Sequence, residues 1–282
     1  MPELPEVETI KRGLINYILN KKIVQVEVFE GKSVKNGELT SVTGAKIIGL
    51  RRFGKALVID LDNGISLMVH LRMTGQLIWR GKENFAAGHP SENFVAELPN
   101  KQTRVVLKFE DGVLYFNDQR KFGFFKILKT SEVEKDEFIK KLAKEPWKME
   151  VKELYDKCQR HAKAPIKAVL LDQTIICGLG NIYADEALFF AKVHPATKAG
   201  TLSEKQVALI LEGAREVMQA SIDSGGSTMA TYVKADGTRG DYLEKFAKVF
   251  RRDGMPCPRC GTIIEKIRVA GRGTHICPEC QK

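Results

Sequence analysis

A proline occupies position 2, and it becomes the terminal residue if the initiator methionine is removed, as we expect before a small residue. A terminal proline carries a secondary amine, and an α-amino pKa of about 7.7–8.0 leaves on the order of a tenth of such groups unprotonated at pH 7. The free amine can attack an electrophilic carbon and form a cationic iminium, which is a strong electron sink. Glu3 and Glu6 follow directly and could act as acid or base. Taken alone, Pro2 could equally be an inert terminal residue.

Four cysteines near the C-terminus have the spacing of metal ligands. Cys257 and Cys260 form one C-x-x-C pair, and Cys277 and Cys280 form a second. Two such pairs at this separation are typical of a four-cysteine zinc site, although a redox dithiol or two disulfides remain alternatives. Four ligands leave no open position on a tetrahedral zinc ion, so we expect a structural metal. The isolated Cys158 and Cys177 are interpreted as ordinary buried thiols.

The residues between the two cysteine pairs predict a β-hairpin with an arginine at its tip. A strand pattern over 262–269 is followed by the turn 270–273 and a return strand over 274–276. A piece this small cannot build its own core, so the metal should supply its folding energy. Arg272 lies between two glycines in the turn, where its guanidinium could bind a phosphate or be merely solvated.

The charge of the chain favours a polyanionic partner. The 45 Lys and Arg residues exceed the 35 Asp and Glu residues by ten, and residues 248–282 contain eight basic and three acidic side chains. Such a balance indicates nucleic acid first. No apolar run approaches the ~20 residues of a membrane span, and the N-terminus lacks the pattern of a secretory signal. We therefore expect an intracellular protein that does not enter a membrane.

The first half of the chain predicts one helix followed by an antiparallel β-structure. Apolar residues at helical spacing predict a helix over about 7–19. Short β-rich runs separated by turn signals then predict a sandwich or barrel. These runs are 23–29, 45–51, 56–61, 66–71, 104–109, 113–116 and 123–128, with a long loop expected over 81–100.

The second half of the chain predicts helices. We expect them over 131–143, 151–161, 165–173, 182–191 and 203–223, with 224–245 forming a loop over a site. Asn181 follows a glycine-rich turn and could cap the next helix, whose N-terminus would favour a phosphate. The predicted organisation is an N-terminal domain (1–130), a helix and linker (131–150), a helical DNA-binding domain (151–245) and the zinc hairpin (246–282).

Several residues of the β-rich half suit contact with DNA. Lys55 ends a basic turn and could neutralise a phosphate or move a proton. Met73 and Phe122 each lie beside basic residues, and apolar wedges of this kind fill gaps in a base stack. Enzymes that act on a base must first extrude it from the duplex. Each residue alone could instead be an ordinary surface or core side chain.

Taken together, these motifs resemble the formamidopyrimidine-DNA glycosylase family, over essentially the whole chain. The resemblance rests on residues 1–9, His70-Leu-Arg-Met73, Asp118–Gly123, Gly178–Tyr183, Val269–His275 and the terminal cysteine pairs. It implies an α+β fold of two domains, with an N-terminal antiparallel β-sandwich flanked by the first helix. The C-terminal domain would hold a helix-two-turn-helix motif and a zinc β-hairpin held by four cysteines.

The resemblance also implies a reaction and the residues that perform it. A monomer in the bacterial cytoplasm, associated with the nucleoid, would excise 8-oxoguanine and formamidopyrimidines from duplex DNA and then cleave the strand at the abasic site by β,δ-elimination. Pro2 would attack C1′, Glu3 would donate a proton, Lys55 would assist β-elimination and Arg272 δ-elimination. The implied DNA contacts are Met73, Arg104, Arg120, Phe122, Lys163, Lys167 and Asn181, and the base-pocket candidates are Glu6, Thr228 and Tyr232.

The chain departs from the family pattern at two places. The family often has His-x-His before a strand, where this chain has Gln102-Thr103-Arg104. A histidine contact to DNA is therefore lost, and Arg104 is the candidate substitute. The linker, often Gly-Pro-Glu-Pro-Leu, reads Ala143-Lys-Glu-Pro-Trp147 here.

Three other functions fit parts of the sequence. An endonuclease VIII-like enzyme would keep the chemistry but prefer oxidised pyrimidines, and the base pocket decides between the two. A DNA-binding protein without activity would need no nucleophile at Pro2. An N-terminal-proline tautomerase acting on small molecules would leave the zinc hairpin and the basic C-terminus without a purpose.

Overall fold

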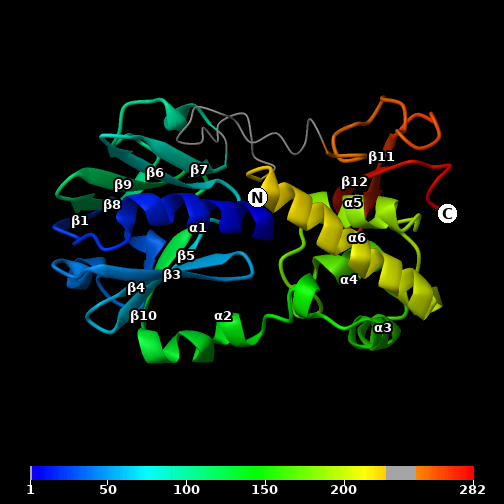
Figure 1. Cartoon of the computed structure of the whole chain (residues 1–282), viewed down its shortest axis with the longest axis horizontal. Coiled ribbons are helices and arrows are strands. Elements are labelled where there is room, and N and C mark those ends of the chain that lie inside the picture. The colour runs from blue at the N-terminus through cyan, green and yellow to red at the C-terminus, as the bar shows by residue number, and fades with distance from the viewer. Residues whose placement is uncertain (1, 90, 227–245) are drawn as a thin grey trace. The chain divides into compact units, whose positions relative to one another are not determined.

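The computed structural model describes residues 2–89, 91–226 and 246–282 (Figure 1). The described residues form two compact units. Unit 1 contains residues up to 140 together with 224–226, and unit 2 contains residues 141–223 together with 246–282. The division falls inside the segment 131–150 that the sequence predicts as helix and linker. No helix in the described ranges is both long and apolar enough to cross a membrane.

Unit 1 is a β-sandwich with one long helix. One sheet has the strand order β1-β8-β9-β6-β7 and the other β2-β10-β5-β4-β3. All pairings within these sheets are antiparallel except the short parallel pair of β10 with β2. The elements are α1 (Leu4–Ile18), β1 (Gln25–Val28), β2 (Val34–Lys35), β3 (Ile47–Phe53), β4 (Ala56–Leu61), β5 (Ile65–His70), β6 (Gly75–Gly81), β7 (Phe85–Gly88), β8 (Thr103–Phe109), β9 (Gly112–Asp118), β10 (Phe124–Lys129) and α2 (Glu137–Lys140).

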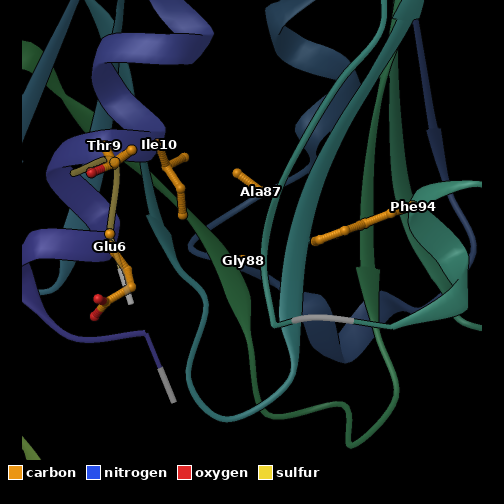
Figure 2. Close-up of a pocket in the computed structure, with 8 residues that line it drawn as sticks. Glu6, Thr9, Ile10, Ala87, Gly88 and Phe94 are labelled. Carbon is orange, nitrogen blue, oxygen red and sulfur yellow. The ribbon is translucent and has the colours of Figure 1, made fainter. Parts of the chain in front are cut away.

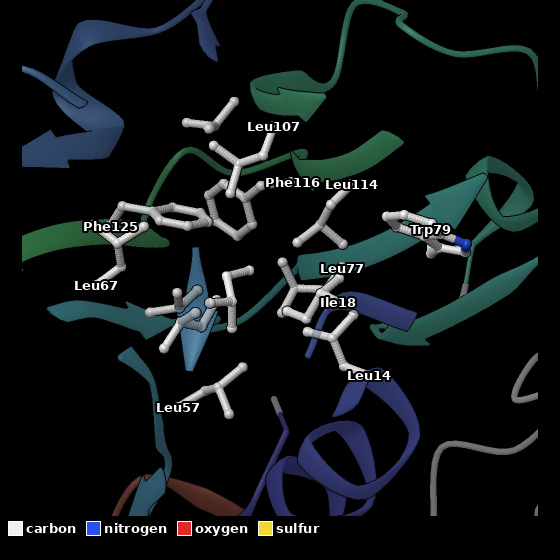
Figure 3. Packing of buried hydrophobic residues seen from close by; sticks show 14 of the residues in the cluster. Leu14, Ile18, Leu57, Leu67, Leu77, Trp79, Leu107, Leu114, Phe116 and Phe125 are labelled. Atoms are coloured by element: carbon white, nitrogen blue, oxygen red, sulfur yellow. The ribbon is translucent and has the colours of Figure 1, made fainter. Parts of the chain in front are cut away.

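The core of unit 1 lies between the two sheets and is completed by α1. Leu57 and Phe125 from one sheet meet Leu77 and Phe116 from the other (Figure 3). Helix α1 contacts β3 and β7, which are edge strands of the two different sheets. Its apolar stripe therefore covers the open edge of the sandwich. That stripe, which includes Leu14, is buried as the helical spacing predicts. Burial of each large apolar side chain stabilises the fold by roughly 1.5–3 kcal/mol.

Two regions of unit 1 differ from the sequence-based prediction. The expected loop over 81–100 contains β7 and a short 3₁₀ helix (Glu92–Phe94), and β6 precedes it. The helix predicted over 131–143 is instead a 3₁₀ helix (Thr130–Lys135) followed by the short α2. Asp136 separates these two pieces with an extended ψ of 136°, and its side chain accepts from Phe138 N and pairs with Lys126. These bonds compete with a continuous helix.

Unit 2 consists of helices and a β-hairpin. Its elements are α3 (Val151–Arg160), α4 (Ile166–Leu171), α5 (Asn181–Phe190), α6 (Glu204–Asp223), β11 (Glu265–Val269) and β12 (Arg272–Ile276). The four helices occupy nearly the predicted ranges. The fully buried Glu186 of α5 accepts N–H bonds of 2.8–2.9 Å from residues 248–250, which ties the segment before the hairpin to this helix. Burial raises the pKa of Glu186, although these bonds act in the opposite direction.

The hairpin turn is tighter than the sequence predicts. Val269 pairs with Arg272, so only Ala270 and Gly271 connect the strands. Their φ angles of 49° and 74° are both positive, as a two-residue hairpin turn of type I′ requires. Arg272 is therefore the first residue of β12, where its position is fixed by strand pairing.

Candidate active site

The first turn of α1 holds the residues that follow the proposed nucleophile. Pro2 is buried, and Glu3 is the N-cap of the helix. Glu3 and Glu6 form a capping box, in which the Glu3 N–H donates to Glu6 Oε2 at 2.8 Å. Both side chains are less than 5% exposed. The helix cap thus fixes two carboxylates directly after Pro2.

A small pocket, with a volume of about 10 Å³, opens beside these carboxylates. Glu6, Thr9 and Ile10 of α1 form one wall, and the opposite wall comes from β7 and the 3₁₀ helix after it (Figure 2). Gly225 and Gly226 complete the lining. Glu6, one of the three base-pocket candidates, therefore lines a pocket. The other two candidates, Thr228 and Tyr232, lie outside the described residues.

Lys55 lies in the turn between β3 and β4, and this turn is tied to α1. Arg52 donates from Nε to Glu8 Oε2 of α1 at 2.8 Å and from Nη1 to Gly54 O at 3.1 Å. Burial would raise the pKa of Glu8, but hydrogen bonds from Arg52, Lys11 and Arg12 lower it to about 2. The resulting ionic contact fixes the turn relative to the helix. Lys55 itself is only 7% exposed.

His70 is a site residue that the sequence reasoning missed. It ends β5, is 5% exposed, and accepts the Arg72 N–H on Nδ1 at 3.0 Å. Burial, followed by the charges of Arg72, Lys55 and Lys35, lowers the pKa of His70 to about 3. His70 is therefore neutral at physiological pH and lies in a strongly positive environment. Such a group of cations suits an anionic ligand such as a phosphate. The motif His70-Leu-Arg-Met73 was noticed in the sequence, but only its methionine was assigned a role.

The predicted wedge residues lie on two loops that are joined by one carboxylate. Arg120 and Phe122 are exposed, with the Arg120 guanidinium 5.0 Å from the Phe122 ring centre, and Met73 is half-buried. Asp118 accepts from Gly123 N at 2.7 Å and from Arg120 N at 3.2 Å. It also accepts from the hydroxyl of Thr74, next to Met73. One buried carboxylate thus fixes both loops while leaving the wedge side chains accessible.

Arg104 does not present its guanidinium to solvent. The residue is 7% exposed, and Nε donates to Asp118 O at 2.8 Å while Nη1 donates to Lys101 O at 3.1 Å. The sequence analysis names Arg104 only as a candidate to replace the histidine contact with DNA. In this structure the arginine instead bonds to the backbone at the base of the wedge turn.

The four predicted metal ligands come together in unit 2. Their Sγ atoms all lie within 4.8 Å of one another, with Cys260 3.4 Å from both Cys277 and Cys280. A tetrahedral zinc ion with Zn–S bonds of about 2.3 Å separates its sulfurs by about 3.8 Å. The cluster therefore fits zinc and leaves no open coordination position. Cys158 and Cys177 are also buried, as expected, and burial raises the pKa of Cys158 to about 11.

Helices α4 and α5 hold the start of β12, where Arg272 lies exposed. Lys167 Nζ pairs with Asp185 Oδ1 at 2.6 Å and donates to Thr274 Oγ1 at 2.7 Å. Asn181 donates from Nδ2 to Gly273 O at 2.9 Å. Lys167 and Asp185 are fully buried, so Lys167 supports the hairpin from inside, where the sequence reasoning expected a contact with the DNA backbone.

Lys163 is accessible at the surface of unit 2, whereas Asn181 bonds to the hairpin and does not cap α5, whose N-cap is Gly180. Lys163 is exposed in the connection between α3 and α4, and Asn181 is half-buried as the first residue of α5. Of the predicted DNA contacts, Arg104, Lys167 and Asn181 thus have side-chain donors that bond within the protein.

Models of known protein families match nearly the whole chain. The formamidopyrimidine-DNA glycosylase N-terminal domain matches residues 1–125, and the formamidopyrimidine-DNA glycosylase H2TH domain matches residues 142–233. A zinc finger found in FPG and IleRS matches residues 254–282. Together with the sulfur geometry, the last match identifies the four cysteines as the ligands of one structural zinc ion.

Individual relatives are similar over their full length. A formamidopyrimidine-DNA glycosylase of Pelotomaculum thermopropionicum is 39% identical, covering 100% of this chain and 99% of that protein. A mutant Lactococcus lactis FPG in complex with Fapy-dG containing DNA is 36% identical with a TM-score of 0.88, and both chains are covered completely. The wild-type Lactococcus lactis enzyme with DNA containing an oxidised pyrimidine is 35% identical with a TM-score of 0.87, again with complete coverage. The chain therefore belongs to the formamidopyrimidine-DNA glycosylase family.

Proposed function

We propose that this chain is a base-excision-repair enzyme that removes oxidised purines from duplex DNA and then cleaves the strand at the abasic site. Pro2, at the head of α1 beside the capped pair Glu3 and Glu6, is the observation that carries this proposal. Binding alone needs neither an N-terminal secondary amine nor buried carboxylates next to it. The family relationship and the net charge of +10 add support for a DNA substrate.

In the proposed reaction, the Pro2 nitrogen attacks C1′ of the damaged nucleoside and displaces the base. Glu3 donates a proton as the sugar ring opens, and the product is an iminium between Pro2 and the deoxyribose. The positive nitrogen then acidifies the C2′ proton, so that the 3′-phosphate leaves by β-elimination. Lys55, buried in the turn that Arg52 fixes to α1, assists this step. Arg272 holds a phosphate and assists δ-elimination, which releases the 5′-phosphate.

The wedge loops would keep the duplex open during this chemistry. Met73, Arg120 and Phe122 would occupy the space that the extruded nucleotide leaves, with Arg120 facing the orphaned base. Their accessibility, together with the fixed loops beneath them, supports this role. Glu6, which lines the small pocket beside α1, would face the extruded base. We propose that a monomer acts in this way on the bacterial nucleoid in the cytoplasm.

One relative supports a second candidate substrate class, oxidised pyrimidines. The wild-type Lactococcus lactis structure contains DNA with an oxidised pyrimidine, so members of this family can accommodate that lesion. A preference for pyrimidines would keep every catalytic role proposed above. The two substrates differ only in the contacts made within the base pocket.

Borohydride trapping tests the nucleophile and the lesion class together. The duplexes carry 8-oxoguanine opposite cytosine, thymine glycol, or a plain abasic site, and mass spectrometry maps the cross-linked peptide. We expect an adduct on Pro2 with the 8-oxoguanine duplex, a much slower adduct in Pro2→Gly, and wild-type trapping in Pro5→Ala, since Pro5 has an amide nitrogen.

Three outcomes would count against parts of the proposal. Trapping on thymine glycol but not on 8-oxoguanine would move the substrate to pyrimidines. Wild-type trapping by Pro2→Gly would remove Pro2 as the nucleophile. DNA binding without any adduct would indicate a protein that recognises damage without processing it.

A further inference from the structure

We propose that Arg104 is a positioning residue that holds the Asp118–Gly123 turn, and with it Arg120 and Phe122, in the conformation needed to enter a base stack. The proposal rests on the proposed function for its consequences on DNA. Its structural basis, however, is a property of the free protein. It also assigns a role to the residue that stands where the family often has a histidine.

The strand that carries Arg104 is irregular at this residue. Thr103 pairs with Asn117 and Val105 with Phe116, so Arg104 is the extra residue of a bulge between β8 and β9. A bulge re-aims one side chain and bends the strand locally. The carbonyl of Arg104 accepts the Phe29 N–H at 2.8 Å, which fixes the backbone of the bulge from its other side. The side chain therefore leaves the strand in a defined direction.

That direction leads to the base of the wedge turn. Nε donates to the carbonyl of Asp118, the last residue of β9, and Nη1 donates to the carbonyl of Lys101 at the entry to β8. The guanidinium thus bridges the ends of two neighbouring strands. Asp118 itself supplies the carboxylate that accepts the Arg120 and Gly123 N–H groups. Arg104 fixes the backbone of the residue whose side chain shapes the turn.

A second contact from the same side supports the turn. Lys121 adopts a φ of 58°, a left-handed conformation that is unfavourable for a side chain with a Cβ. Its ammonium pairs with Glu30 Oε2 at 2.7 Å, and Glu30 directly follows the residue that bonds to Arg104 O. Arg104 and Glu30 therefore hold the start and the middle of one strained turn. A histidine at position 104 would be too short to bridge both carbonyls.

If Arg104 instead contacted a DNA phosphate, its exposure and its effect on DNA binding would differ. A side chain that neutralises a phosphate should be exposed, and its removal should reduce the salt dependence of DNA binding by about 0.9 in log K against log salt. Arg104 is 7% exposed, and its guanidinium donates to backbone carbonyls. The geometry therefore favours positioning over direct contact.

Amide hydrogen exchange of the free protein tests the structural part without any DNA. Arg104→Met keeps the length of the side chain and removes its donors. Lys101→Met removes one exposed charge at the same strand end and keeps the carbonyl, so it is the matched control. We expect exchange at Arg120 and Gly123 to accelerate about tenfold in Arg104→Met and not in the control, as the loss of bonds from a charged donor implies. Unchanged exchange in Arg104→Met would overturn the proposal.

Two measurements on DNA test the consequence for recognition. We expect Arg104→Met to lower the ratio of excision opposite cytosine to excision opposite adenine, because Arg120 is no longer held toward the opposite base. The salt dependence of binding should equal that of wild type. A slope reduced by about 0.9, with the base ratio intact, would identify a phosphate contact and refute the positioning role. If the wild type excises nothing, the proposed function fails, while the exchange result still decides the role of Arg104.

A second variant guards against misfolding. Arg104→Lys keeps the charge but cannot donate to both carbonyls in the same way. We expect it to show accelerated exchange at Arg120 and Gly123 with a wild-type salt slope. Wild-type exchange in this variant would show that charge alone suffices, which contradicts the proposal. This comparison remains valid even if Arg104→Met does not fold.

Discussion

Replacing His70 with asparagine should remove a loss of stability that occurs as the pH falls from 7 to 5. His70 is buried, with its ring 5.9 Å from that of Phe124 and 5.4 Å from that of Phe138. Its Nδ1 accepts the Arg72 N–H, and the side-chain oxygen of asparagine can accept the same bond. The substitution therefore keeps the local turn while removing the titrating group.

The expected magnitude follows from the lowered pKa. Burial and three nearby cations lower the pKa of His70 from 6.5 to about 3. Above pH 6.5 the group is neutral in both the folded and the unfolded chain, so it contributes nothing to the pH dependence. Below 6.5 the unfolded chain binds a proton that the folded chain does not, and stability falls. Over the 1.5 units down to pH 5, this linkage costs about 2 kcal/mol.

Urea unfolding at pH 7 and pH 5 would measure this difference. The chain contains two tryptophans, Trp79 in the core of unit 1 and Trp147 in unit 2. A Trp147→Phe background leaves Trp79 as the only reporter, so the fluorescence transition follows the unit that contains His70. Asparagine loses the ring packing and should lower stability at both pH values. The test therefore compares the change between pH values, which cancels that loss.

Two results would refute the lowered pKa of His70. The wild type should lose about 2 kcal/mol more than His70→Asn between pH 7 and pH 5. Equal losses in the two proteins would mean that His70 titrates normally. A direct NMR titration in which the His70 ring protonates near its ordinary pKa of 6.5 would contradict the expectation independently.

Three further predictions follow from contacts described above. Glu8→Gln should destabilise unit 1 by up to about 3 kcal/mol at pH 7, because the carboxylate with its pKa lowered to about 2 stabilises the fold above pH 4.5. This contribution is lost between pH 4.5 and 2, so urea unfolding at pH 6 and pH 3 should show it. Equal acid sensitivity of variant and wild type would contradict it. Cys257→Ser should lower the zinc content well below one ion per chain by elemental analysis and expose the hairpin amides to exchange, whereas full zinc retention would disprove four-cysteine ligation. Gly75→Ala should cost about 1–3 kcal/mol in urea unfolding, since the new Cβ would lie 2.4 Å from Leu71 O, while the control Gly31→Ala meets no atom within 4 Å and should cost much less.

Much of the fold could be predicted because its signals are local. Strand β4 (Ala56–Leu61) has the predicted bounds, and helix α5 begins one residue before its predicted start. The cysteine pairs predict the metal, and the residues between them predict the hairpin. In each case neighbouring residues carry the whole pattern, through alternation, helical spacing or ligand spacing.

The misses arise where distant parts of the chain determine the structure. Strand β7 (Phe85–Gly88) is buried at every position and contains small residues, so it lacks the alternation that marks a strand. Strand β7 forms because it pairs with β6 and packs against α1. The helix expected over 131–143 is interrupted at Asp136, which forms an ion pair with Lys126 of β10. Neither contact leaves a sign in the local sequence.

The candidate site divides in the same way. Residue types and order select Pro2 and Glu3 as candidates, because the chemistry proposed for them depends on their place before the first helix. They are not sufficient for Arg104 and Lys167, because both are candidate DNA contacts and both are buried by tertiary contacts. His70 was missed since only packing against Phe124 and Phe138 makes it a neutral group among cations.

The bond from Thr74 to Asp118 has a consequence for the design of variants. Because one carboxylate serves the loop after β5 and the turn after β9, neither loop has an independent conformation. A residue inserted into one loop would shift the anchor of the other, so the two segments should be exchanged between relatives only as a pair that includes Thr74 and Asp118. Libraries that aim to alter the choice of opposite base should therefore vary Met73, Arg120 and Phe122 as a single cassette on an unchanged pair of anchors.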